Sequence, residues 1–216
     1  MTPDTSGRGR FITFEGGEGA GKSTQIRRLA ETLRARGIDV VLTREPGGSP
    51  GAEAIRTLLV EGEPGRWDGI TETLLFAAAR HDHVERTIRP ALARGAWVLC
   101  DRFTDSTIAY QGYGAGADIE LIRSLSAAAA GDVVPDLTLI LDLPIEEGLK
   151  RAASRAGGED RFERKGAEFH TRLREGFLAI AKDEPVRCAI IDATGSPDEV
   201  AEKISKLVSG RLKSIV

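Results

Sequence analysis

Short apolar runs alternate with amphipathic segments along most of the chain. Five runs are compact enough to be buried strands, at residues 10–15, 39–43, 97–101, 137–142 and 186–192. Apolar residues at helical spacing predict helices at residues 24–36, 71–94, 119–131, 145–153, 166–182 and 198–212. The segment 71–94 is long enough for two helices or one bent helix. Uninterrupted apolar strands separated by helices favour an α/β fold with a parallel sheet covered on both faces.

The residues that follow the predicted strands are strongly polar. The first strand runs into a glycine-rich segment, and the others end in Thr43-Arg44-Glu45-Pro46, Asp101-Arg102, Asp142-Leu143-Pro144 and Asp192-Ala193-Thr194. Ligands of open parallel sheets bind beyond the carboxyl ends of the strands. Charges gathered there are costly unless they meet a ligand, a metal or one another. We therefore expect the functional site at this edge of the sheet.

The glycine-rich segment fits the phosphate-binding loop G-x-x-x-x-G-K-[ST]. It comprises Gly16, Gly17, Glu18, Gly19, Ala20, Gly21, Lys22 and Ser23, between a predicted strand and a predicted helix. In such a loop backbone N–H groups and the helix N-terminus attract phosphate oxygens, and Lys22 reaches the transferred phosphoryl group. The Ser23 hydroxyl is a ligand for magnesium.

Two further clusters narrow the chemistry. Asp101 ends an apolar strand, as expected of a carboxylate on the magnesium side, and Arg102 suits bidentate binding of a second phosphate. The alternative is a structural Asp–Arg surface pair. Arginines and a lysine also surround a Gly157-Gly158 pair, at positions Arg151, Arg155, Arg161, Arg164 and Lys165. This run is either a solvated face or a mobile lid whose arginines stabilise the transferring phosphoryl group.

Composition excludes some classes of protein. The chain has 216 residues and a net charge of −3, so nothing global indicates binding to nucleic acid or to an anionic membrane. It contains no asparagine and therefore lacks the Asn-Lys-x-Asp motif of GTPases. Residues 1–9 lack the apolar core of a signal peptide, and we expect a disordered lead there. Cys100 and Cys188 lie in apolar runs, which favours reduced thiols and a cytoplasmic location.

Taken together, the motifs resemble those of bacterial thymidylate kinases from about Arg10 to the C-terminus. The matching segments, in order, are 14–24, 43–48, 75–80 (Leu-Phe-Ala-Ala-Ala-Arg), 101–107 (Asp-Arg-Phe-Thr-Asp-Ser-Thr), 109–112 (Ala-Tyr-Gln-Gly) and 135–142. The resemblance implies the fold of P-loop nucleoside monophosphate kinases, as one domain over residues 10–216 with a lid at about 151–165. It also implies transfer of the γ-phosphoryl group of ATP to dTMP, with Mg²⁺, and a homodimer that pairs through helices around 71–94.

The resemblance also implies roles for individual residues. The implied catalytic residues are Glu18, Lys22, Asp101, Arg102, Arg155 and Arg161, with Ser23 and Asp101 organising magnesium. The implied ATP-binding residues are 16–24 (Gly16 to Thr24) and Arg151. The implied dTMP-binding residues are Glu45, Pro46, Arg56, Phe76, Arg80, Arg102, Thr107, Tyr110 and Gln111. Phe76 would stack on thymine and Arg80 would hydrogen-bond its edge. Thr107 and Gln111 would complete the base pocket, and Arg102 with the turn at Glu45 would hold the phosphate. Because Gly19 stands where one type of the family has a catalytic arginine, the lid arginines would take that role.

Two alternatives stay open on the residues alone. One is a kinase of another nucleoside monophosphate, and the other is an ATP-binding regulatory switch. Phe103 departs from the Tyr or His often found after the Asp-Arg pair of the family. A phenyl ring fills the space beside the sugar C2′ but donates no hydrogen bond, which leaves the strictness against ribonucleotides open.

Overall fold

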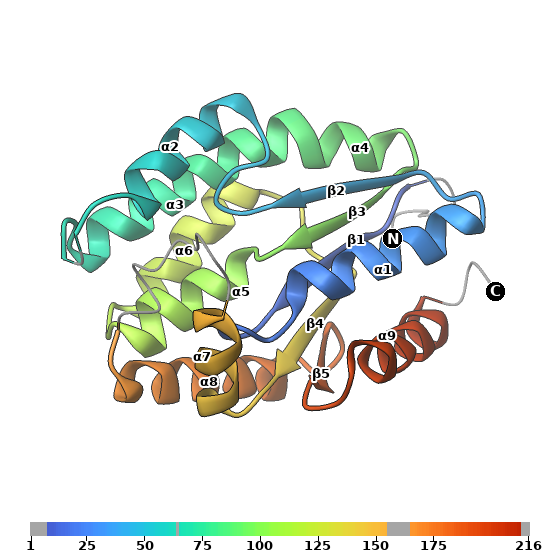
Figure 1. The fold of residues 1–216 in the computed structure, drawn as a ribbon. Helices are drawn as coiled ribbons and strands as arrows, with labels where there is room; N and C mark the ends of the chain where they lie inside the picture. Colours follow the sequence, from blue (N-terminus) through green and yellow to red (C-terminus); the bar gives the residue numbers. More distant parts are fainter. Residues whose placement is uncertain (1–7, 64, 155–164, 213–216) are drawn as a thin grey trace.

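A twisted five-stranded parallel sheet forms the centre of the molecule (Figure 1). The computed structural model describes residues 8–63, 65–154 and 165–212. The strands are β1 (Phe11–Glu15), β2 (Val40–Arg44), β3 (Trp97–Asp101), β4 (Leu137–Asp142) and β5 (Cys188–Asp192). Their order is β2-β3-β1-β4-β5, and each neighbouring pair is parallel. The predicted α/β fold is confirmed, and each strand lies within two residues of its predicted bounds.

Helices connect the strands and cover both faces of the sheet. They are α1 (Lys22–Ala35), α2 (Pro50–Val60), α3 (Gly69–His83), α4 (Arg89–Ala93), α5 (Thr104–Thr107), α6 (Ile119–Ala130), α7 (Ile145–Ala153), α8 (Ala167–Asp183) and α9 (Pro197–Arg211), with π-helical segments η1 (Val84–Ile88) and η2 (Ile108–Gly114). Within the described ranges, no helix is both long and apolar enough to cross a membrane.

Successive side chains of each strand point to opposite faces of the sheet, so the core has two layers. Ile12 and Phe14 of β1 point to the face covered by α1 and α9, where they pack with Leu29 and Ile204. Phe11, one position away, points to the opposite face and packs against η1 and α4. Further apolar side chains of α8 and η2 complete this second layer. The result is a three-layer sandwich, and both cysteines are free and buried in it, as predicted.

Two helical segments were not predicted. Helix α2 begins with Ser49 as N-cap and Pro50 in its first turn and buries Ala52 and Leu59. These are helix signals, but the flanking segments 46–48 and 62–69 indicate loops, and the residues between them were left unassigned. The segment α5–η2 follows β3 directly, and its glycines at 112 and 114 hid the helical pattern. The predicted helix at 71–94 is one continuous run in which α3 passes through η1 into α4.

Glycines allow the loop after β1 to lie against neighbouring backbone. Gly16 has φ 129°, and a Cβ there would lie 2.4 Å from the Leu141 carbonyl oxygen. Gly19 has φ 69°, and its Cβ would lie 2.0 Å from the Gly148 oxygen at the start of α7. Neither position accepts a side chain without movement of the backbone. The loop is therefore fixed between β4 and α7, at the carboxyl edge of the sheet.

Candidate active site

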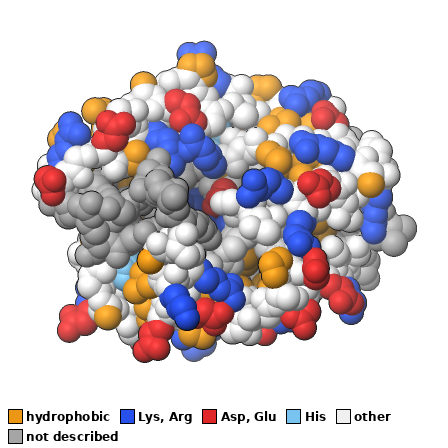
Figure 2. All heavy atoms as spheres, viewed as in Figure 1, with side chains coloured by type: hydrophobic (Ala, Val, Ile, Leu, Met, Phe, Trp, Pro, Cys, Tyr) orange, Lys and Arg blue, Asp and Glu red, His pale blue; other side chains and the backbone are white. Residues whose placement is uncertain are grey.

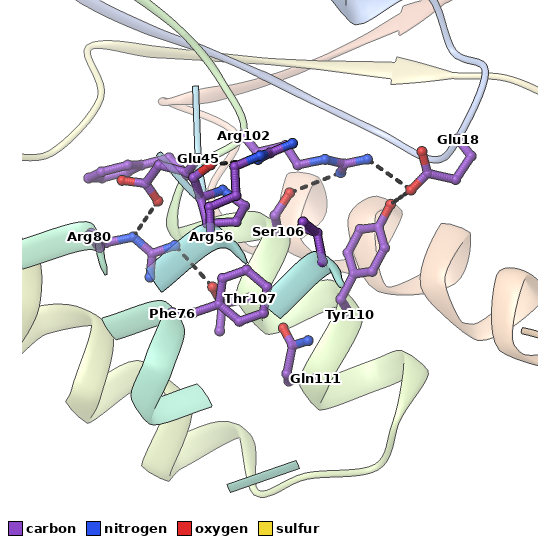
Figure 3. A pocket seen from close by; sticks show the side chains of 13 residues that line it. Glu18, Glu45, Arg56, Phe76, Arg80, Arg102, Ser106, Thr107, Tyr110 and Gln111 are labelled. Carbon is purple, nitrogen blue, oxygen red and sulfur yellow. Dashed lines mark hydrogen bonds and ion pairs between the residues drawn. The ribbon is translucent and has the colours of Figure 1, made fainter. Parts of the chain in front are cut away.

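A cavity of about 130 Å³ opens beside the loop after β1, at the carboxyl edge of the sheet (Figure 3). Its walls come from the loop, the turn after β2, helices α2 and α3, and the segment from Arg102 through η2. The lining residues are Glu18, Glu45, Pro46, Arg56, Val60, Phe76, Arg80, Arg102, Phe103, Ser106, Thr107, Tyr110 and Gln111. All nine residues assigned to the acceptor nucleotide by resemblance are among them. The structure therefore brings together the predicted acceptor residues from four separate stretches of sequence.

A buried ion pair fixes one wall of the cavity. Arg80 is 2 % exposed, and its Nε donates to Glu45 Oε2 at 2.8 Å while its Nη2 donates to Thr107 Oγ1 at 3.0 Å. The other oxygen of Glu45 lies 3.0 Å from His83 Nδ1, and His83 Nε2 lies 2.6 Å from Thr43 Oγ1. His81 contacts the Ala129 carbonyl oxygen instead, so the two histidines point apart. The Arg80 guanidinium is thereby held in one orientation.

Two polar atoms near this wall lack a partner. Arg80 Nη1 and Gln111 Oε1 are buried and make no hydrogen bond to any described residue. Gln111 Nε2 donates to Glu72 Oε2 at 3.2 Å, which orients the amide so that the oxygen is left over. A buried donor or acceptor without a partner costs roughly 1–3 kcal/mol. A donor and an acceptor left unpaired by residues that line one cavity indicate a ligand with a complementary polar edge.

Arg102 occupies the opposite wall, between the cavity and the phosphate loop (Figure 3). Its Nη2 donates to Glu18 Oε1 at 3.1 Å, and Tyr110 Oη donates to the same oxygen at 2.6 Å. The Arg102 guanidinium also lies over the Tyr110 ring, 4.8 Å from its centroid. Burial alone would raise the pKa of Glu18, but the charges of Arg102 and Lys22 outweigh it and lower that pKa to about 2. Glu18 is therefore ionised at neutral pH.

The predicted phosphate and magnesium groups meet at the N-terminus of α1. Lys22 Nζ donates to the carbonyl oxygens of Gly16 and Gly17 at 3.0 and 2.9 Å. Burial, together with the nearby charge of Arg102, lowers the pKa of Lys22 to about 8. Ser23 Oγ donates to Asp101 Oδ2 at 3.0 Å. Because magnesium prefers oxygen ligands and takes few from protein, a hydroxyl and a carboxylate beside a phosphate loop fit it.

A second hollow lies on the other side of the phosphate loop. It is lined by residues 19–21, Thr24 and Gln25 from the loop and α1, by Arg151 of α7, and by the segment 193–197 after β5 with Val200. Arg151 Nη1 donates to the Ala193 oxygen at 3.3 Å. Among the described residues that line this hollow, Arg151 carries a positive charge, which suits an anionic ligand. On the face seen in Figure 1, Lys and Arg side chains intermingle with Asp and Glu (Figure 2).

Some residues around the cavity had no predicted role. Val60 and Ser106 line it, and Glu72 orients Gln111 from below. Glu15, at the end of β1, is fully buried and accepts from Phe103 N at 2.7 Å and from Ser106 Oγ at 2.5 Å. Burial and the neighbouring charge of Asp105 raise the pKa of Glu15 to about 8. A carboxyl directly before the phosphate loop was the available signal for Glu15, whereas nothing in the sequence placed Glu72 beside Gln111.

Comparison with known proteins decides the family. The sequence profile of the family described as thymidylate kinase matches residues 14–204. The chain is 63% identical over 205 residues to a thymidylate kinase of Caulobacter vibrioides, covering 95% of this chain and 98% of that one. It is 55% identical to one of Afipia carboxidovorans, covering 96% and 92% of the two chains. A crystal structure of thymidylate kinase from Ehrlichia chaffeensis superposes with a TM-score of 0.76 at 39% identity, over 94% of this chain and 99% of that one.

This chain belongs to the thymidylate kinase family. A thymidylate kinase is a nucleoside monophosphate kinase, and its phosphoryl donor is ATP. The predicted fold and the predicted phosphorylation of dTMP are therefore confirmed, and neither alternative function is favoured.

The arginines that we predict to act from a lid cannot be placed relative to this site. Arg155 and Arg161 lie within residues 155–164, outside the described residues. The assignment to the lid-arginine type thus stays a prediction. In the phosphate loop, the close approach of Gly19 to Gly148 leaves no room for an arginine at position 19 with the present backbone.

Proposed function

We propose that the 130 Å³ cavity binds dTMP and that the unpaired atoms of Arg80 and Gln111 read the thymine edge. Thymine presents an acceptor at O4 and, next to it, a donor at N3–H. Arg80 Nη1 complements the acceptor and Gln111 Oε1 complements the donor. Phe76, which lines the same cavity, offers a ring face for stacking. The pair of oppositely polarised orphan atoms is the single observation that carries this assignment.

The acceptor phosphate lies toward Arg102 in this proposal. The guanidinium lies between the base pocket and the phosphate loop, so a phosphate bound to it faces the donor nucleotide. Arg56 and the turn at Pro46 form the side of the cavity nearest to it, and Arg56 Nη1 donates to the Pro46 oxygen at 2.5 Å. Glu18 and Tyr110 lie at the sugar. The Glu45 side chain acts through Arg80, because both of its oxygens are bonded to Arg80 and His83.

ATP binds with its phosphates on residues 16–24 and its base in the hollow lined by Arg151 and residues 193–197. Ser23 and Asp101 hold Mg²⁺, which neutralises charge on the phosphates when bound. The acceptor is a phosphate oxygen that is already largely ionised at neutral pH, so the transfer requires no strong general base. What remains for the protein is alignment and charge: Lys22 and Arg102 bind the donor and acceptor phosphates on either side of the transferred group.

Turnover of two variants tests these roles. Lys22→Ala and Arg102→Ala should each lower kcat by more than about a hundredfold, because each removes a positive side chain that stabilises the transferred phosphoryl group. Arg27→Ala removes a charge from the exposed surface of α1, where Arg27 Nε donates to the Ser23 oxygen, and serves as the matched control. Near-normal turnover of either test variant would overturn its role.

We further propose that the enzyme is a cytoplasmic homodimer. Ile70 and Leu74 of α3 are 57% and 49% exposed and lie one helical turn apart, and Leu121 of the contacting helix α6 is also exposed. Apolar side chains gathered on one helical face are typical of a subunit interface. The two free buried thiols support a reducing compartment.

A further inference from the structure

Arg102 has a backbone conformation that its own side chain does not favour. Its φ is 73°, in the left-handed region, which is sterically unfavourable for a residue with a Cβ. Its N–H donates to the Phe14 oxygen at 3.0 Å, which ties the residue to β1 on one side. The next N–H, that of Phe103, donates to Glu15 Oε1 at 2.7 Å. Glu15 therefore holds the backbone on the far side of the strained residue.

Glu15 also reaches the side chain of Arg102 through one hydroxyl. Ser106 Oγ lies 2.5 Å from Glu15 Oε2, and Arg102 Nη1 donates to the same Oγ at 3.2 Å. Figure 3 shows Arg102 extended between Ser106 and Glu18. One carboxyl thus fixes both the backbone after Arg102 and a hydroxyl that orients its guanidinium. Glu15 itself is fully buried and does not line the cavity.

We infer that Glu15 is a positioning residue for the acceptor phosphate, acting through the Phe103 N–H and the Ser106 hydroxyl on Arg102. The inference rests on the proposed role of Arg102 in binding that phosphate. Glu15 should therefore affect binding of the phosphate and not of the base. If the Arg102 guanidinium turns away, its contact to the phosphate is lost, but the contacts of the base to Arg80 and Gln111 stay in place. Loss of Glu15 should weaken dTMP, which has the phosphate, far more than thymidine, which lacks it.

The ratio of the dissociation constants of thymidine and dTMP measures this effect. Both constants are obtained by calorimetric titration of the full-length enzyme, thymidine by competition where needed. Glu15→Met keeps the length of the side chain but removes both hydrogen-bonding oxygens, and it should lower the ratio by at least about tenfold, as expected when Arg102 loses its charge-assisted contact to the phosphate. Ser106→Ala removes only the hydroxyl and should lower the ratio by less. Glu15→Gln keeps a contact to both partners and should restore most of the ratio.

Thr13→Val is the matched control. Thr13 lies two positions earlier on the same face of β1, is fully buried, and bonds Thr138 Oγ1 at 2.8 Å rather than any partner of Arg102. It should leave the ratio unchanged even if it lowers the unfolding temperature. An unchanged ratio in Glu15→Met, an equal loss of both ligands, or a Glu15→Gln variant as poor as Glu15→Met would each overturn the inference.

Arg102→Ala separates this inference from the proposed function. If Arg102→Ala weakens dTMP and thymidine alike, Arg102 does not bind the phosphate and the proposed site is wrong. If Arg102→Ala is selective for dTMP but Glu15→Met is not, the site stands and the positioning role of Glu15 fails. In the Arg102→Ala background, Glu15→Met should cause no further loss of selectivity.

Discussion

Arg102, Arg80 and Gln111 show how far single residues were predictable. Their motifs placed them in one site, and the residue types indicated phosphate and base-edge recognition. Their supports were not predictable, because Glu15, Glu72 and Glu45 act through contacts between distant segments. The sequence around a carboxylate does not show which residue it will bond. That Arg80 Nη1 and Gln111 Oε1 are unpaired is known only from the structure, in which other atoms of both side chains have partners.

The role of Gln111 predicts a selective loss. Gln111→Leu removes the acceptor for thymine N3–H at nearly constant volume, and kcat/KM for dTMP should fall by about a hundredfold or more, since a buried N–H would be left unpaired. The KM for ATP should stay within about twofold, because Gln111 lies away from the ATP hollow. Steady-state kinetics with each substrate varied in turn check this. Equal losses for both substrates would contradict the assignment.

Glu15 predicts a pH dependence of stability. Because burial raises its pKa to about 8 in the folded protein, folding favours the protonated form. The contribution is fully present below the ordinary pKa of a glutamate, and it is lost as the pH rises through 8. Glu15→Gln carries no titrating group, so its free energy of unfolding should gain on that of the wild type between pH 5 and pH 9, by urea denaturation. A constant difference across this range would show that Glu15 is ionised throughout.

At the scale of elements, the strand ends carried most of the prediction. Periodicity identified the five strands, and the parallel sheet then placed their ends together. Helix α2 and the segment α5–η2 were missed, although both line the cavity through Arg56, Val60 and the residues from Ser106 to Gln111. Gly112 and Gly114 lie against neighbouring side chains, where a Cβ would come within 3.0 Å of Ile119 and 2.5 Å of Phe169. Local breaker signals were thus outweighed by tertiary packing.

A side chain of α1, that of Gln25, is hydrogen-bonded to the end of the segment after β5. Gln25 is 3% exposed, and its Nε2 donates to the Pro197 oxygen at 2.9 Å, at the end of the segment that lines the proposed ATP hollow. Gln25→Leu should therefore raise the KM for ATP about threefold to tenfold, the value of one hydrogen bond, and leave that for dTMP unchanged. Gln25 and Gln111 are the two glutamines of the chain, so the same Gln→Leu change tests the donor site in one variant and the acceptor site in the other. A dTMP-selective effect of Gln25→Leu would contradict the division into donor and acceptor hollows.

At the scale of the molecule, the exposed apolar face of α3 and α6 predicts self-association. Leu74→Glu places a charge in that face and should convert the proposed dimer to a monomer, as measured by light scattering coupled to size-exclusion chromatography. Val186→Glu changes a residue that is 89% exposed and lies just before β5, and it should leave the mass unchanged. A wild-type protein that is monomeric at micromolar concentration would refute the proposal.

Acceptor specificity tests the central claim, that Arg80 and Gln111 read thymine, most directly. A coupled assay with ATP and dTMP, dUMP, dCMP, dGMP or AMP gives kcat/KM for each acceptor. Cytosine has the reverse pattern of thymine, with an acceptor at N3 and a donor at N4, so kcat/KM for dCMP should be about a thousandfold or more below that for dTMP. Because dUMP lacks one methyl group, its kcat/KM should be about tenfold to a hundredfold below that for dTMP. A dCMP or purine nucleotide phosphorylated as efficiently as dTMP would contradict the account.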